Sequence, residues 1–214
     1  MLSNIILSFS VSLFALTVAQ TPPSFRPSCN QNLGITWPNN VSVTPGSPLL
    51  ASDTSTQPSL SASIDLLKGD GEYLLVMLDP DVQFPQQPPT TILHWIQPSF
   101  QYNSTSFALT PTSDPRNEGV ASYAGPHPPA GQIHRYILLL FIQPEEYTFP
   151  EDFERFLPAD IPHRVDFDVT EFVKAAELAE PVAANYFTVE GLGLSSKEEL
   201  KREVEGLSGF VLVP

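Results

Sequence analysis

Five polar side chains of types that can do chemistry stand inside or directly beside strongly apolar stretches of the sequence. They are Asp79, Asp81, His94, His134 and Tyr136. Polar groups at the ends of buried strands are costly unless they satisfy one another or contact a ligand. Imidazole and phenol groups can each donate a hydrogen bond to an oxyanion, and an imidazole or a carboxylate can hold or transfer a proton. The sequence therefore predicts a small polar binding pocket built from these side chains.

Four of these five residues also have an interpretation that involves no ligand. Asp79 and Asp81 could bond to the neighbouring backbone in a turn after a strand. His94 could be a hydrogen-bonded core residue, and His134 could orient a ligand-binding neighbour without touching the ligand itself. The same Asp and His side chains could formally hold a metal ion. The residue types alone leave these alternatives open.

Apolar periodicity predicts the strands that must position these residues. Residues 73–78 and 133–142 are apolar on both faces, which is typical of central strands of a sheet. Residues 60–66 alternate between apolar and polar side chains, as a half-buried strand does. Residues 91–97 form another expected strand, and Pro98 should end it because proline cannot donate to a strand ladder.

The polar residues follow or open these strands. Asp-Pro-Asp at 79–81 should end the strand that precedes it. Successive side chains of a strand point to opposite faces, so Arg135 should face away from His134 and Tyr136. We expect Arg135 to bind an acidic loop residue and not the ligand.

Helical patterns are few and lie mainly in the last third of the chain. Residues 170–179 carry apolar side chains at helical spacing, with Thr170 as the expected N-cap. A second helix is expected from about residue 195 to 205, and residues 153–156 suggest a short helical turn. The sum is a mostly β protein with a few short peripheral helices and a C-terminal helix.

The order of the motifs resembles the phosphatidylethanolamine-binding protein family, and in particular its secreted fungal branch. The matching motifs are Asp-Pro-Asp at 79–81, His-Trp at 94–95, a Gly/Pro-rich loop at 123–133 that leads into His-Arg-Tyr at 134–136, and the segments 164–168 and 181–187. The resemblance runs from about residue 35 to residue 189. It implies a compact β-sandwich with a small anion pocket.

The resemblance also implies which residues bind the ligand. By motif position these are Asp79, His94, His134 and Tyr136, with Asp81 and Pro128 at the pocket wall. It implies no cofactor and no metal ion. The loop of residues 82–85 departs from the pattern of many relatives, so the ligand need not be the usual one. His127 adds a titratable group at the rim.

Three functions follow from the resemblance. The first is a binding protein for a small anionic ligand, such as phosphate, a phospholipid head group or a carboxylate. The second is an accessory or catalytic role in fungal secondary metabolism, where some relatives assist the dimerising coupling of maleic-anhydride-type polyketide units by chemistry such as proton transfer. The third is inhibition of a serine carboxypeptidase or binding of another protein partner. Whether the chain is an enzyme stays open, although no G-x-S-x-G motif suggests a serine hydrolase.

The N-terminal segment predicts export. Residues 1–20 contain no charged side chain, and Thr17 and Ala19 are small residues placed for cleavage after Ala19. The apolar run is too short and too interrupted for a comfortable membrane span, so stable membrane insertion is not expected. We therefore expect a signal peptide at 1–19, a single secreted domain at 20–214, and glycosylation at Asn40 and Asn103, each of which opens a sequon.

Composition excludes other classes of protein. The chain has 24 acidic and 10 basic residues, a net charge of −14, which disfavours nucleic-acid binding and docking to anionic membranes. Hydrophobic residues make up 42% of the chain, enough for a core and too many for a disordered protein. Cys29 is the single cysteine, so no internal disulfide can form, and the fate of this thiol is open.

Overall fold

The computed structural model describes residues 19–63, 65–67, 71–112, 120–158 and 160–193. The predicted signal peptide, except for its last residue, and the predicted helix near residues 195–205 lie outside these ranges. No helix in the described ranges has the length and apolar character needed to cross a membrane.

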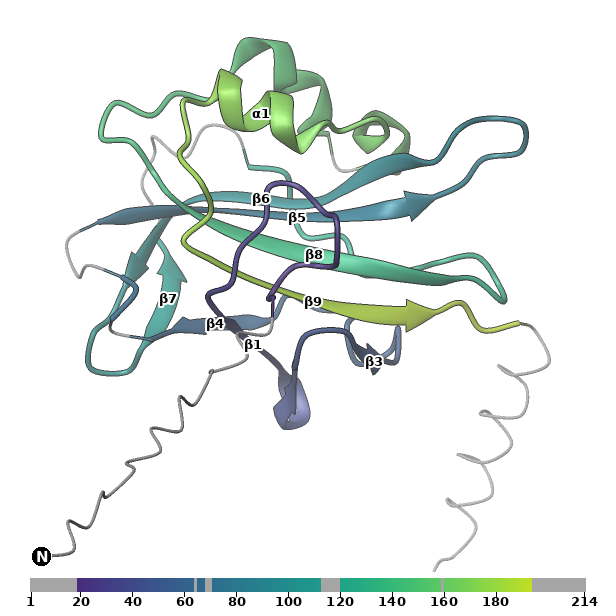
Figure 1. Cartoon of the computed structure of the whole chain (residues 1–214), viewed down its shortest axis with the longest axis horizontal. Coiled ribbons are helices and arrows are strands. Elements are labelled where there is room, and N and C mark those ends of the chain that lie inside the picture. The colour runs from purple at the N-terminus through teal and green to yellow at the C-terminus, as the bar shows by residue number, and fades with distance from the viewer. Residues whose placement is uncertain (1–18, 64, 68–70, 113–119, 159, 194–214) are drawn as a thin grey trace, which may run out of the picture.

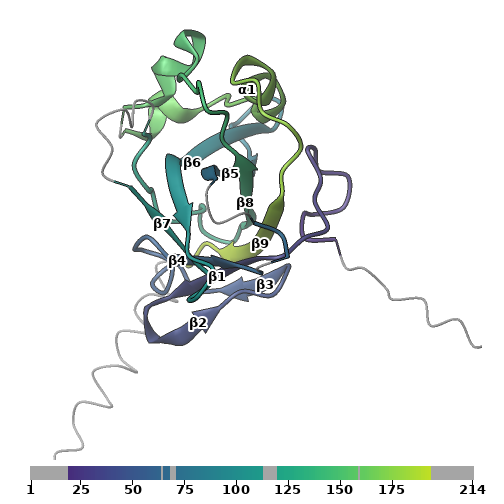
Figure 2. The ribbon, with the colours of Figure 1, turned by 90° about the vertical axis from the view of Figure 1, so that its left-hand side faces the viewer.

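The described residues form one curled sheet of nine strands (Figure 1). The sheet order is β2-β1-β4-β7-β6-β5-β8-β9-β3, and every neighbouring pair is antiparallel except β3 and β9. The strands are β1 (Leu33–Trp37), β2 (Val41–Ser42), β3 (Ser47–Leu49), β4 (Ser59–Ala62), β5 (Glu72–Val82), β6 (Thr90–Tyr102), β7 (Ala108–Pro111), β8 (Ile133–Ile142) and β9 (Ala183–Glu190). Figure 2 shows the curl, in which β1 comes to lie near β8 and β9 without pairing with them.

Short helices cover one face of the central strands (Figure 1). They are the 3-10 helices η2 (Glu151–Phe156) and η3 (Ile161–Arg164) and the helix α1 (Val169–Ala175); a further 3-10 turn, η1 (Pro38–Asn40), follows β1. The predicted helix at 170–179 is therefore present but shorter. Its N-cap is Asp168 and not Thr170, because the Asp168 carboxylate accepts hydrogen bonds from the backbone N–H groups of Thr170 and Glu171.

Two apolar cores explain why the central strands are hydrophobic on both faces. Alternate residues of β5, namely Tyr73, Leu75 and Met77, lie inside the curl. The intervening Leu74, Val76 and Leu78 pack toward the helices and their phenylalanines. The predicted mostly β fold with few helices is confirmed, and periodicity correctly identified its central strands.

The strand predicted at 60–66 ends earlier, at Ala62. Two other strands continue past their predicted ends, and β-bulges are the reason. β5 continues through Asp79-Pro80-Asp81 to Val82, with a register shift between Asp79 and Val82. β6 continues through Pro98 to Tyr102, with a shift opposite Tyr73 and Leu75. A bulge lets a proline sit in a strand because the extra residue is left out of the ladder.

Candidate functional site

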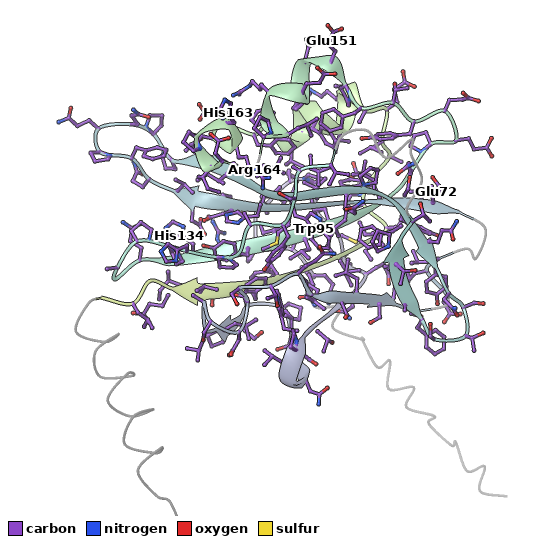
Figure 3. All side chains as sticks on the ribbon, turned by 180° about the vertical axis from the view of Figure 1, so that it is seen from behind. Glu72, Trp95, His134, Glu151, His163 and Arg164 are labelled. Atoms are coloured by element: carbon purple, nitrogen blue, oxygen red, sulfur yellow. The ribbon has the colours of Figure 1, made fainter. Side chains whose placement is uncertain are left out.

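A cavity of about 400 Å³ opens where β5 ends and β6 and β8 begin. Its polar floor is formed by Asp79, His94, His134 and Tyr136, all buried and contributed by these three neighbouring strands. Figure 3 shows His134 toward the end of the sheet that lies opposite Glu72. The structure therefore brings together the four residues predicted to form the centre of the pocket.

The remaining wall is largely apolar. Val82, Phe84, Ile92, Pro128 and Ile161 line the cavity. Phe84 and Ile161 are also among the exposed large hydrophobic residues of the protein. The family resemblance implied that Pro128 lies at the pocket wall, and Pro128 does line the cavity, as do Val82, Gln83 and Phe84 of the loop that departs from the family pattern. Ile161 comes from η3, far along the chain, and no local signal pointed to it.

A bulge in β6 places His94. Met77 pairs with Trp95 and Leu78 pairs with Leu93, so His94 is an extra residue in its strand. A bulge of this kind re-aims a side chain. Here the imidazole packs edge-on against Tyr136, with ring centroids 5.1 Å apart.

The loop after β7 holds His94 in place by a pair of reciprocal bonds. Nδ1 of His94 donates to the carbonyl oxygen of Ala124 at 2.7 Å, and the Ala124 N–H donates to the carbonyl oxygen of His94 at 2.8 Å. The fully buried Arg164 donates to the carbonyl oxygens of Ser122 and Pro158, at 2.7 and 2.9 Å, and ties the same loop to η3. His94 therefore sits in a rigid frame.

The proton states of His94 and Tyr136 follow from their burial. Burial lowers the pKa of His94, although the bond to Ala124 and the charge of Asp79 oppose this shift. His94 is therefore neutral near pH 7, and its Nε2 is an acceptor, where the sequence suggested a second donor. Burial, reinforced by the nearby Asp79 carboxylate, raises the pKa of Tyr136, so its phenol keeps its proton.

Asp79 fixes the second histidine. Its Oδ2 accepts a hydrogen bond from Nδ1 of His134 at 2.7 Å, and its Oδ1 accepts from the backbone N–H of Asp81 at 2.9 Å. Both side chains of this ion pair are only 4% exposed. Buried charges are tolerated when they are paired and hydrogen-bonded, as here. Asp79 thus sets the orientation of the His134 ring.

The other nitrogen of His134 meets a residue that the sequence did not single out. Nε2 of His134 lies 3.0 Å from Oε1 of the exposed Gln132. Both ring nitrogens of His134 therefore lie within hydrogen-bond distance of a side-chain oxygen. The only available signal was the position of Gln132 two residues before His134, a spacing that puts two side chains on one face of a strand, although β8 itself begins at Ile133.

Asp81 does not line the cavity, contrary to the prediction. The bulge between Asp79 and Val82 turns its carboxylate to Arg135. The backbone N–H and Nε of Arg135 each donate to Oδ2 of Asp81 at 2.8 Å, and a guanidinium NH₂ group donates to Oδ1. Burial alone would raise the pKa of Asp81, but the bonds and charge of Arg135 outweigh it and hold this pKa below its usual range. Arg135 therefore binds an acidic residue, as expected, but this residue lies in β5 and not in a loop.

Other residues named from the sequence lie outside the floor of the cavity. Asn40 and Asn103 are exposed, as glycosylation would require. His127 is exposed and lines the cavity rim. Cys29 is buried and is a free thiol. In the ranges that the structure describes, no group of three or more His, Cys, Asp or Glu side chains is arranged to hold a metal ion.

Sequence comparison finds relatives for almost the whole chain. The family model described as phosphatidylethanolamine-binding protein matches residues 39–187. The protein named phomoidride biosynthesis cluster protein N, from Talaromyces stipitatus, is 39% identical over 194 residues, which cover 86% of this chain and 97% of that protein. TERMINAL FLOWER 1 from Arabidopsis thaliana is 30% identical over 170 residues, covering 78% of this chain and 82% of that protein.

Comparison with solved structures finds proteins that share this fold. A carboxypeptidase Y inhibitor solved in complex with its cognate proteinase matches with a TM-score of 0.55 and 21% identity, over 77% of this chain and 85% of the inhibitor. A phosphatidylethanolamine-binding protein from Plasmodium vivax matches with a TM-score of 0.55 and 20% identity, over 74% of this chain and 84% of that one. At this identity the likeness concerns the fold alone.

Proposed function

The chain belongs to the phosphatidylethanolamine-binding protein family, and from this premise we propose that its cavity binds a small ligand with an acidic head group and an apolar tail. Asp79, His94, His134 and Tyr136 would contact the head group, and the wall around Phe84 would contact the tail. The observation that carries the proposal is the joining of a buried polar floor to an apolar wall in one cavity.

The charges at the cavity favour a ligand of low net charge. None of the described residues that line it is Lys or Arg, and Asp79 is one of the floor residues. The Tyr136 hydroxyl can donate a hydrogen bond to a ligand oxygen. Nε2 of the neutral His94 can accept a hydrogen bond from a hydroxyl, an ammonium group or a protonated acid. A phosphate ester, a carboxylic acid or an ethanolamine-type head group offers such a mixture of donors and acceptors.

Isothermal titration of the chain from Gln20 onward tests this proposal. The two ligands are phosphoethanolamine and an alkyl-maleic acid, and the variant is Tyr136→Phe, which removes one hydroxyl from the cavity. We expect saturable binding of at least one ligand and a loss of about five- to tenfold in affinity for the variant, the usual effect of one hydrogen bond. Tyr102→Phe is the matched control, because Tyr102 is equally buried and donates to the carbonyl oxygen of Ala62 elsewhere in the core. Binding that both variants leave intact would reject the cavity as the site.

A second candidate function is supported by the relative named for the phomoidride biosynthesis cluster. Here the cavity would hold a polyketide acid or anhydride while two such units are coupled, with a histidine receiving or returning a proton. The neutral His94 is the group suited to accept that proton. The test is product analysis after incubation with an alkyl-maleic anhydride, where dimeric products above the protein-free background, lost in His94→Gln, support the role.

We also propose that the chain is exported and glycosylated. The uncharged N-terminal segment and the exposed Asn40 and Asn103 support this. Expression of the full chain in a fungal host should give a secreted protein whose N-terminus is Gln20. Peptide-N-glycosidase treatment should reduce its mass, and Asn40→Gln with Asn103→Gln should abolish that change. Retention of the full chain in the cell would refute the export proposal.

A further inference from the structure

We infer that the side chain of Gln132 competes with the ligand for the Nε2–H of His134 and thereby selects ligands with an anionic oxygen. The inference rests on the proposed binding function of the cavity. Its starting point is the amide oxygen of Gln132, which lies 3.0 Å from Nε2 of His134. An amide oxygen is only an acceptor, so Nε2 donates to it, and a ligand oxygen has to displace the amide to take the same hydrogen.

Asp79 already binds one of the two ring nitrogens of His134, so only the other nitrogen can bind a ligand. Nδ1 of His134 is bound to Oδ2 of Asp79 at 2.7 Å, in a pair that is only 4% exposed on either side. Turning the ring would break this buried charged bond, so Nε2–H is the donor that His134 can present to the cavity. A ligand reaches this hydrogen only if the Gln132 amide moves away.

The side chain of Gln132 can move while its backbone stays fixed. The N–H of Gln132 donates to the carbonyl oxygen of Pro129 at 3.0 Å, and its carbonyl oxygen accepts from Gly191 at 2.8 Å. The residue itself is exposed, and its side chain is not part of either apolar core. Displacing the amide therefore exchanges one hydrogen bond for another and exposes no apolar surface.

This exchange discriminates between ligands by charge. A hydrogen bond from an imidazolium to an anionic oxygen is about twice as strong as one to a neutral acceptor. A phosphate or carboxylate oxygen therefore displaces the amide, whereas an alcohol, an ether or a neutral amide gains nothing by doing so. Gln132 acts as an internal competitor that raises the threshold for neutral ligands.

The test is titration of inorganic phosphate into the chain from Gln20 and into Gln132→Ala. Loss of the competitor should tighten phosphate binding by about two- to tenfold, the range for one hydrogen bond. Gln132→Glu should weaken it by at least that factor, because a carboxylate holds the imidazolium more strongly than an amide does. Gln101→Ala is the control, because Gln101 is also exposed but lies near the C-terminal end of β6, where it pairs with Glu72 of β5.

Nitrogen NMR of the His134 ring gives a readout that is independent of the ligand. In ligand-free Gln132→Ala the Nε2 resonance should shift, and the Nδ1 resonance, held by Asp79, should stay. An unmoved Nε2 resonance, or weaker phosphate binding by Gln132→Ala, overturns the inference and leaves the proposed function standing. Absence of phosphate binding in the parent chain and in every variant overturns the inference, and failure of phosphoethanolamine and alkyl-maleic acid to bind as well rejects the proposed function with it.

Discussion

Replacing Asp79 with Ala should destabilise the protein severely. The substitution leaves two hydrogen-bond donors without their acceptor: Nδ1–H of His134, now 2.7 Å from Asp79, and the backbone N–H of Asp81, now at 2.9 Å. We assign about 2 kcal/mol to the buried, charge-assisted bond and about 1 kcal/mol to the partly buried amide, in total about 3 kcal/mol. For a domain of this size the melting temperature should fall by about 6–12 °C.

Asp79→Asn should restore most of this loss. The amide has the shape of the carboxylate, and its oxygen can still accept from the Asp81 N–H. Its NH₂ group can donate to Nδ1 of His134 once the neutral ring carries its proton on Nε2 instead. The ordering is therefore the parent chain, then Asp79→Asn, then Asp79→Ala.

The protein contains its own control for this experiment. His163 and Asp160 form the same kind of pair at 2.6 Å, but their side chains are 55% and 56% exposed. Asp160→Ala should not measurably change the melting temperature, because solvent replaces the lost partner. Thermal unfolding can be followed by tryptophan fluorescence, since Trp37 and Trp95 are buried in the inner core. Equal effects of Asp79→Ala and Asp160→Ala would refute the argument that burial gives the Asp79 pair its strength.

Three further outcomes follow from contacts outside the cavity floor. In the parent chain, the lowered pKa of Asp81 gives stability that is present at neutral pH and lost as pH falls. Arg135→Ala removes the cause of this low pKa, so the variant should lose less stability below about pH 4. Melting curves from pH 7 to 3 measure this difference. Gly191→Ala should lower the melting temperature and weaken ligand binding together, because its Cβ would lie 1.9 Å from the carbonyl oxygen of Pro129 in the cavity wall. Asp168→Ala should cost about 1 kcal/mol, or about 2–4 °C, by uncapping α1.

Matched variants make these outcomes specific. Thr170→Ala should cost less than Asp168→Ala, because the structure places Thr170 inside the first turn and not at the cap. Gly34→Ala should cost less than Gly191→Ala, because the atom nearest to its Cβ is the rotatable hydroxyl of Ser61. Reversal of either order would contradict the contacts described above.

The site was predictable where the sequence gives side chains of opposite character at adjacent positions. The apolar runs at 73–78 and 133–142 required central strands, and polar residues at their ends required partners or a ligand. Period-two alternation then separated Arg135 from His134 and Tyr136, as the structure has it. These inferences need only local spacing and burial, and both are encoded in a short stretch of sequence.

The site was not predictable where one inserted residue reverses the alternation. Asp79 and Asp81 would share a face of a regular strand, yet a bulge around Pro80 sends one carboxylate to His134 and the other to Arg135. In β6 a bulge has the opposite effect, because it turns His94 toward Tyr136. A bulge depends on the register of the partner strand, which local spacing does not contain.

The two bulges are what allow one pair of neighbouring strands to supply both an acid and a base to the same cavity. Without the bulge in β6, the side chain of His94 would point to the face of the sheet opposite Trp95, whose side chain packs in the core inside the curl. Without the bulge in β5, Asp81 would add a second carboxylate beside Asp79, and like charges so close together oppose anion binding. The irregular register thus leaves one acidic side chain, paired with His134, where a regular sheet would place two. This arrangement supports our proposal of a ligand with an acidic head group, in a chain whose net charge is −14.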